Sequence, residues 1–229
     1  MTRPANIFAL DIKMTIEKMS FLINAFDEIY KLNTRLVGDY NVYNIMSAIG
    51  VCRMIGISQK NIENTINNIA NIDGRWEIFS LDNNQLKNIK IVVDFAHTSD
   101  GFDKILSLIK SLRKGRIITL FGCVGYSDKE KRKSMGDIAS KYSDYIIFTS
   151  DNICNSSFMD IVNDVDIKIP HKDIEDREKA VEYAFGILED NDTLILLGKG
   201  NEKVQKVKDT SIAYDEIKIV KNLLKQYKK

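Results

Sequence analysis

The 229-residue sequence contains few prolines, cysteines and histidines: two, three and two, respectively. Two prolines exclude a long proline-rich linker. An odd number of widely spaced cysteines argues against a disulfide framework and favours a reducing compartment, so we expect a cytoplasmic protein. With two histidines and no closely spaced Cys/His pairs, a zinc site is not expected.

Long apolar runs and an excess of one charge are also missing. No run reaches the length of a membrane span, and no N-terminal stretch has the pattern of a signal peptide, so no membrane association is expected. Lysine and arginine (33) balance aspartate and glutamate (32), which leaves a net charge of +1 and no general affinity for nucleic acid. The densest basic run, residues 129–133, is interpreted as a solvated helix start, although the preceding glycine loop leaves phosphate contact open.

The first seventy residues predict a small α+β unit. Apolar and polar residues alternate over 30–36, which is typical of a half-buried strand. Asp39 or Asn41 is expected to cap a helix that closes at Gly56. Ser58 is expected to cap a second helix over about 59–70.

From Arg75 onward, apolar strands and amphipathic helices alternate, which predicts an α/β fold with a Rossmann-like, mostly parallel sheet flanked by helices. We place the domain boundary so that the domains are residues 1–72 and 73–229. The predicted strands cover residues 90–94, 116–121, 144–149, 167–169 and 193–197. The predicted helices cover about 100–112, with Ser99 or Asp100 as cap, 128–142, 176–188 and 213–227.

Four polar or glycine-rich segments follow predicted strands. Ligands of open α/β sheets bind outside the carboxyl ends of the strands, so these segments are considered together. They are residues 94–97, 122–125, 150–152 and 198–202.

Each segment has a functional and a plain structural interpretation. Asp94 can accept both hydroxyls of a ribose, or it can cap the next turn or hold His97. The 122–125 loop can approach an anion, or be a simple turn. Lys199 can supply a mobile positive charge and Glu202 can hold an amino group; alternatively, this is a flexible turn with solvated charges.

Taken in order, these segments resemble the C-terminal half of a Mur ligase, and most closely the muramyl-tripeptide synthetase branch. The resemblance covers nearly the whole chain. It implies a Mur-ligase C-terminal domain preceded by the tail of the central domain. The motifs that carry it are Gly38-Asp39-Tyr40-Asn41-Val42-Tyr43-Asn44, Gly74-Arg75-Trp76-Glu77, Asp94-Phe95-Ala96-His97-Thr98-Ser99-Asp100 and Gly198-Lys199-Gly200-Asn201-Glu202.

The resemblance also implies site residues. By this resemblance, adenine lies beside Asn41 and Asn44, and the ribose binds at Asp94. The nucleotide also lies near Arg75, which resembles an interdomain arginine, and near His97. Residues similar to those that hold the incoming amino acid are Asp151, Asn152, Gly198, Lys199 and Glu202.

Departures from the family pattern are as informative. No segment reads G-x-x-G-K-[ST], so Mg²⁺ is expected only through a missing or separate P-loop domain. Cys154 and Ser127 stand where the family has arginines, and only arginine makes bidentate bonds to a carboxylate. Asn201 replaces a histidine. The residues that resemble the family's adenosine contacts are kept, whereas several that would contact the amino acid are replaced.

The resemblance implies part of an ATP-dependent ligase of peptidoglycan precursor synthesis. Its expected partners are ATP or ADP, an amino acid, a UDP-muramyl precursor and a separate chain that carries the P-loop. Two alternatives stay open. The chain is a non-catalytic Mur-like module that binds nucleotide or a partner, or it is an unrelated Rossmann-like fold.

Overall fold

The computed structural model describes residues 6–126 and 128–227. The chain divides into two compact units, Met1–Asn71 and Ile72–Lys229. Each unit has a hydrophobic core of its own.

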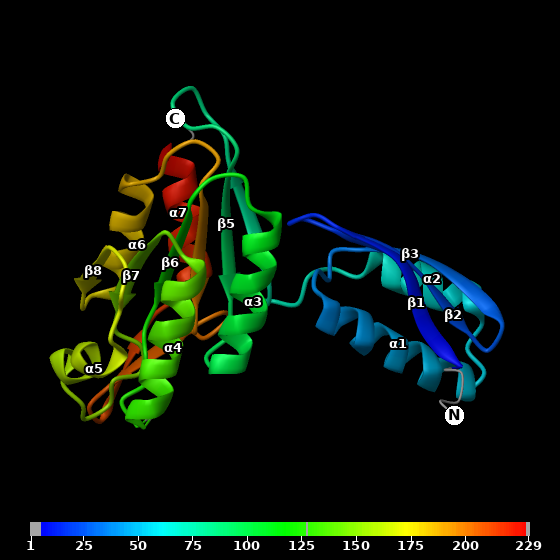
Figure 1. Ribbon diagram of the computed structural model, residues 1–229, viewed down its shortest axis with the longest axis horizontal. Helices are drawn as coiled ribbons and strands as arrows, with labels where there is room; N and C mark the ends of the chain where they lie inside the picture. Colours follow the sequence, from blue (N-terminus) through cyan, green and yellow to red (C-terminus); the bar gives the residue numbers. More distant parts are fainter. Residues whose placement is uncertain (1–5, 127, 228–229) are drawn as a thin grey trace. The chain divides into compact units, whose positions relative to one another are not determined.

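The first unit is a three-stranded antiparallel sheet with two helices (Figure 1). The alternation over 30–34 predicted a half-buried strand, and Tyr30, Leu32 and Thr34 are indeed buried. The side chains of Tyr30 and Leu32 share a core with apolar residues of both helices. The elements are β1 (Ile7–Met14), β2 (Met19–Ala25), β3 (Glu28–Thr34), α1 (Asp39–Met54) and α2 (Gln59–Asn68).

The helix starts of this unit were predicted in part. Ser58 caps α2, because its side chain accepts a hydrogen bond from the Asn61 N–H. The prediction for α1 was wrong: its N-cap is Gly38 (φ 112°), and no side chain caps it. Asp39 is already helical, and the Asn41 side chain donates to the Val37 carbonyl at 2.8 Å.

The second unit is built on a six-stranded sheet, which confirms the predicted α/β class and its mostly parallel pairing. The strand order is β4-β5-β9-β6-β7-β8, and β4 is antiparallel to β5. The four pairings from β5 to β8 are parallel. These strands are β4 (Glu77–Leu81), β5 (Ile89–Asp94), β6 (Ile117–Phe121), β7 (Tyr145–Thr149), β8 (His171–Ile174) and β9 (Thr193–Leu197).

Helices cover both faces of this sheet, with α3 and α4 on one face and α6 and α7 on the other (Figure 1). Ile91 and Val93 of β5 belong to the core cluster that includes α6 and α7. Opposite lies a chain of aromatic contacts with centroid distances of 5.1 to 5.9 Å, formed by Phe102, Phe121, Phe148 and Phe158. The helices are α3 (Ser99–Leu112), α4 (Lys129–Tyr142), α5 (Phe158–Val165), α6 (Arg177–Gly186) and α7 (Glu216–Tyr227).

The strand predicted at 167–169 was wrong. The strand that pairs with β7 begins after Pro170, with His171 opposite Ile146. It lies at the sheet edge and is partly exposed, so it has no apolar run to reveal it.

Other elements were missed or misplaced. β4 and the hairpin of β10 (Val204–Val207) and β11 (Thr210–Ala213) were not predicted, because short and partly exposed segments have weak periodicity. Helix α5 was also missed, although its apolar residues Phe158, Ile161 and Val165 share one buried face. The cap of α3 is Thr98, which accepts from the Gly101 N–H, and neither Ser99 nor Asp100. The last helix begins at Glu216, since Ala213 ends β11.

Candidate functional site

Four loops meet at the carboxyl ends of neighbouring parallel strands, as the sequence predicted. They follow β5, β9, β6 and β7, which are adjacent in that order. The chain runs from β5 to β6 and later returns to insert β9 between them. This is the switch point of strand order at which open α/β sheets bind ligands.

Glycines bring these loops into backbone contact. A Cβ added to Gly122 would lie 2.4 Å from the Thr149 carbonyl oxygen. A Cβ added to Gly74, which has φ +68°, would lie 2.1 Å from the Asn201 nitrogen. Only glycine allows such close approach. The strand-end segments therefore form one packed edge that also includes residue 74.

Asp94 ends β5 and is 5% exposed. Its Oδ1 accepts from the Ala96 N–H and its Oδ2 from the Trp76 N–H, both at 2.7 Å. Burial raises the pKa of this carboxyl, against the lowering effect of the two N–H groups and of Arg75. Asp94 thus caps the next turn, which is one of the two structural interpretations of this residue given above. It does not hold the imidazole of His97, whose Nδ1 lies 3.0 Å from the Phe95 carbonyl oxygen.

Phe95 connects two of the predicted nucleotide residues. The Arg75 guanidinium carbon lies 4.3 Å above the Phe95 ring centroid. The His97 ring meets the same ring edge-on, at a centroid distance of 4.8 Å. Arg75 and His97 are exposed. Phe95 was not predicted as a site residue, although its place between Asp94 and His97 was a signal. Arg75, Phe95 and His97 together place a cation and aromatic ring edges beside the buried carboxylate of Asp94.

Lys199 is fully buried, so its predicted mobility was wrong, as was the alternative of solvated charges. Its ammonium lies 2.8 Å from Asp151 Oδ1 and 2.9 Å from Glu202 Oε2. It also donates to Asn152 Oδ1 at 2.8 Å and to the Val204 carbonyl at 3.3 Å. The structure therefore brings the predicted amino-acid residues together, but with their acidic groups around Lys199.

The β10–β11 hairpin holds this cluster in place. Gln205 donates to the Ser150 hydroxyl and to the Asp151 carbonyl, each at 3.0 Å. The Lys206 N–H donates to Asn152 Oδ1 at 2.8 Å. These contacts were not predicted, because they depend on the hairpin folding back over the β7 loop.

A buried ion pair lies behind the β9 loop. Arg177 and Glu216 have fully buried side chains and are 2.7 Å apart. Arg177 also donates to the Leu197 carbonyl at 2.9 Å, directly before Gly198. Tyr214 donates to Glu216 at 2.9 Å, and burial raises the pKa of its phenol. This network fixes the end of β9, and it was not predicted from the sequence.

The two predicted adenine contacts lie in the first unit. Asn44 Nδ2 donates to Asn41 Oδ1 at 3.3 Å, near the start of α1. Their nucleotide role stays a prediction. Ser127 lies outside the described residues. Across 6–126 and 128–227, no cluster of three acidic, cysteine or histidine side chains is arranged for a metal, and no helix has the length and apolarity to cross a membrane.

Comparison with known proteins identifies the family. The model for the Mur ligase, glutamate ligase domain, matches residues 74–200. This chain belongs to the Mur ligase family. The predicted family is therefore confirmed.

Curated relatives agree with this assignment. The UDP-N-acetylmuramoyl-L-alanyl-D-glutamate--2,6-diaminopimelate ligase of Alkaliphilus oremlandii is 33% identical over 94% of this chain and 45% of its own length. Ligase 1 of the same name from Clostridium acetobutylicum is 34% identical over 99% of this chain and 47% of its own. The chain spans about half the length of the curated relatives it matches.

Solved structures show the same fold. A UDP-N-acetylmuramoyl-L-alanyl-D-glutamate--2,6-diaminopimelate ligase aligns with a TM-score of 0.69 and 22% identity, covering 98% of this chain and 46% of that one. The MurF ligase of Thermotoga maritima, in complex with ADP, aligns with a TM-score of 0.64 and 15% identity, covering 84% and 42%.

Proposed function

We propose that this chain is the portion of an ATP-dependent Mur-type ligase that closes on the nucleotide and presents the amino acid in peptidoglycan precursor synthesis. One observation carries the proposal. The Gly198 N–H donates to the Asp94 carbonyl at 3.1 Å, so the nucleotide-side and amino-acid-side residues belong to one hydrogen-bonded edge. A shared edge supports a role in which nucleotide binding and amino-acid presentation are coupled.

The nucleotide side is proposed to contact the adenosine part of ATP. The exposed Arg75 and His97 flank Phe95, and these groups can contact a planar base or an anion. Each Asp94 oxygen accepts one backbone bond, and a carboxylate oxygen can accept two. Asn41 and Asn44 are proposed to contact adenine from the first unit. Mg²⁺ and the transferred phosphoryl group would be held by the P-loop-bearing half of a Mur ligase, since this sequence has no P-loop.

The incoming amino acid is proposed to bind at Asp151, Asn152, Gly198 and Glu202. Lys199 holds these residues in position. The Glu202 side chain is 31% exposed, so it can receive an amino group. The named relatives act with 2,6-diaminopimelate. Cys154 provides no planar fork for a second carboxylate, so diaminopimelate is not proposed as the substrate.

In such a ligase, ATP would transfer its γ-phosphoryl group to the carboxylate of a UDP-muramyl precursor and leave as ADP. The amino group of the incoming amino acid would then attack the acyl carbon, so that the amide bond forms, inorganic phosphate leaves and the amine gives up a proton. The residues of this chain would orient the amino acid and cover the nucleotide. Phosphoryl transfer itself would need the P-loop-bearing half.

Calorimetric titration with adenosine, ADP and Mg-ATP tests the nucleotide site. Adenosine is expected to bind about as tightly as Mg-ATP, because the phosphates find no clamp here. Asp94→Ala and Asn44→Ala are each expected to weaken binding about tenfold, equivalent to about 1.4 kcal/mol. Lys172→Ala serves as the control variant, because Lys172 is exposed and lies in the edge strand β8. Unchanged affinity in both site variants would show that the assigned site is wrong.

A second candidate is a non-catalytic module that binds nucleotide or a partner protein. It is favoured by Lys199, whose ammonium already occupies the acidic cluster. A ligase assay on this chain together with the P-loop-bearing half separates the two. Amino-acid-dependent release of ADP excludes the non-catalytic candidate, whereas nucleotide binding without turnover favours it.

A further inference from the structure

Strand β10 carries a polar side chain on its inward face. Alternate residues of a strand face opposite sides, and Gln205 and Val207 are the two half-buried ones. The apolar Val204 is instead 41% exposed, so an amide faces the protein while an apolar residue faces solvent. Burial of an amide costs free energy unless it is hydrogen-bonded, so the bonds of Gln205 decide what this position does.

The Gln205 amide donates twice to the β7 loop. Its Nε2 lies 3.0 Å from the Ser150 hydroxyl and 3.0 Å from the Asp151 carbonyl oxygen. The Ser150 hydroxyl gives its own proton to the Glu175 carbonyl, so it accepts from Gln205. The bonds therefore run from β10 across the end of β7 to the residue after β8. An amide NH2 group satisfies both acceptors, whereas a carboxylate satisfies neither.

The backbone next to Gln205 orients the amide of Asn152. The Lys206 N–H donates to Asn152 Oδ1 at 2.8 Å, and the Lys199 ammonium donates to the same oxygen. Because both partners are donors, the amide oxygen faces them and the NH2 group faces Glu202, with Nδ2 3.4 Å from Oε2. The position of the hairpin thus decides how the donor group of Asn152 lies beside the Glu202 carboxylate.

We propose that Gln205 is a positioning residue, which holds the β7 loop against the β9 loop so that Asn152 and Glu202 face the same amino acid. This inference rests on the proposed function, which assigns those two residues to the incoming amino acid. Gln205 is three residues after Glu202 and bonds the carbonyl directly before Asn152, so one side chain couples the two segments. An amide N–H suits the carboxylate of an amino acid, and a carboxylate suits its ammonium group.

The nucleotide side does not share these bonds. The Asp94 carboxylate accepts from the Trp76 and Ala96 N–H groups, whereas the Gln205 amide donates to the β7 loop. Gln205 also lies outside both hydrophobic core clusters, so the chain should fold without its amide. Loss of this amide should therefore lower the affinity for an amino acid and leave the affinity for adenosine unchanged. A general loss of folding would lower both affinities.

Two variants of the whole chain test the inference. Gln205→Met keeps the length of the side chain and removes both donors, and Gln205→Glu also sets negative charge against the Asp151 carbonyl oxygen. Nuclear magnetic resonance titration with L-lysine and with meso-2,6-diaminopimelate measures amino-acid affinity. We expect one of these probes to bind the unaltered chain, and Gln205→Met to weaken that binding about tenfold, with a larger loss in Gln205→Glu. Adenosine affinity should stay within about twofold in both variants.

Amide hydrogen exchange measures the positioning itself, without a ligand. The Lys206 N–H is bonded to Asn152, and it should exchange about tenfold faster in Gln205→Met, because the hairpin then opens more often. Ser211 is exposed and pairs with Lys206 across the hairpin. Ser211→Ala is the matched control, and the Lys206 exchange rate should stay within about twofold in it.

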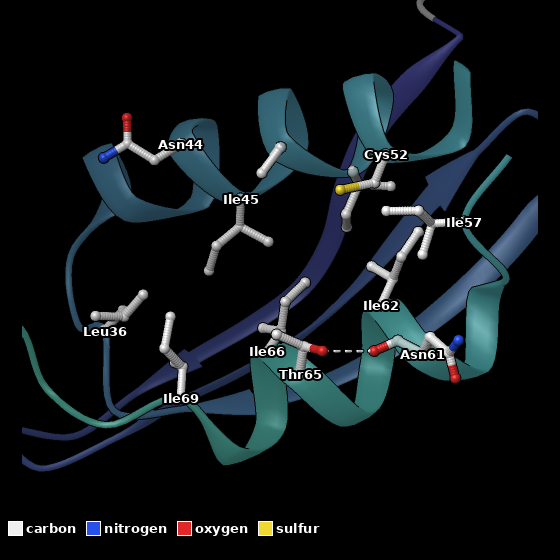
Figure 2. Close-up of a pocket in the computed structure, with 12 residues that line it drawn as sticks. Leu36, Asn44, Ile45, Cys52, Ile57, Asn61, Ile62, Thr65, Ile66 and Ile69 are labelled. Carbon is white, nitrogen blue, oxygen red and sulfur yellow. Dashed lines mark hydrogen bonds between the residues drawn. The ribbon is translucent and has the colours of Figure 1, made fainter. Parts of the chain in front are cut away.

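Thr65→Ala is a second control, which removes a hydrogen bond from the first unit. Thr65 lies in the wall of an apolar groove between α1 and α2, and its hydroxyl donates to the Asn61 carbonyl at 2.8 Å (Figure 2). This variant loses a side-chain bond as Gln205→Met does, but not one to the β7 loop. Amino-acid affinity should therefore be unchanged.

Three results would overturn the inference. Both Gln205 variants bind the amino acid as tightly as the unaltered chain does, or the Lys206 N–H exchanges in them at the unaltered rate. Alternatively, the affinities for adenosine and for the amino acid fall equally, which indicates a loss of folding. If neither amino acid binds the unaltered chain, the amino-acid role in the proposed function fails and the inference fails with it. If one binds and the variants do not weaken it, only the inference is wrong.

Discussion

At the scale of single residues, burial decides what each charged side chain can do. Lys199 is fully buried and its charge is balanced by Asp151 and Glu202, so it organises the loop around it. Arg75 is exposed beside the same edge and stays available to a ligand. Two basic residues of similar appearance in the sequence therefore differ in environment, one enclosed by acidic groups and the other facing solvent.

The buried carboxyl of Asp94 predicts a pH effect on stability. Its folded pKa is raised above 3.8, chiefly by burial. Between 3.8 and the raised value, the native state binds more protons than the unfolded state, so this group's contribution to stability falls as pH rises through that window. Urea unfolding of the wild type and of Asp94→Asn should show the wild type losing free energy relative to the variant over this window. A flat or rising difference would contradict the raised pKa.

At the scale of elements, the network of Arg177 and Glu216 joins α6 and α7 to the end of β9. Arg177 belongs to α6, Glu216 begins α7, and the Leu197 carbonyl is the last of β9. Gly198 follows immediately, so the position of the β9 loop depends on this pair. The loops of the site are thus held by two contacts: the buried Arg177–Glu216 pair fixes the end of β9, and the β10–β11 hairpin bonds to the β7 loop.

Removing one partner of this pair should be costly. Arg177→Met leaves Glu216 buried without its counter-charge, and we expect a loss of about 3–5 kcal/mol in unfolding free energy. The double variant Arg177→Met/Glu216→Leu removes both charges and should recover a large part of the loss. Denaturant unfolding measures all three proteins. A single variant as stable as the wild type would show that the pair does not hold the loop.

At the scale of the whole molecule, two separate cores predict two unfolding events. The second unit of 72–229 has a core that includes strands of its sheet together with α6 and α7. The first unit is smaller, and small domains bury a smaller share of their surface, so we expect it to be the less stable of the two. It also carries most of the exposed apolar residues.

Differential scanning calorimetry should therefore resolve a lower transition for the first unit and a higher one for the second. A fragment of residues 72–229 should keep the higher transition, because none of its core cluster comes from the first unit. A single transition, together with an unfolded fragment, would show that the cores are not independent.

Much of the second unit was predictable because its strands are short apolar runs followed by polar or glycine loops. β9 was predicted at Thr193–Leu197 with the bounds it has. The polar edge strand β8 was misplaced, since exposure removes the apolar run. The site loops were correctly placed at strand ends, but the partners of Lys199 and the role of the hairpin were not predicted.

The sequence by itself determined the family, the α/β class and the four loops at the site, because local periodicity and ordered motifs carry that information. Only the tertiary structure decided which strands are neighbours, with β9 between β5 and β6. It also decided that Lys199 is enclosed, that Arg177 meets Glu216, and that a groove stays open between α1 and α2. The physical reason is that burial and pairing depend on contacts between residues far apart in the chain, which no local pattern specifies.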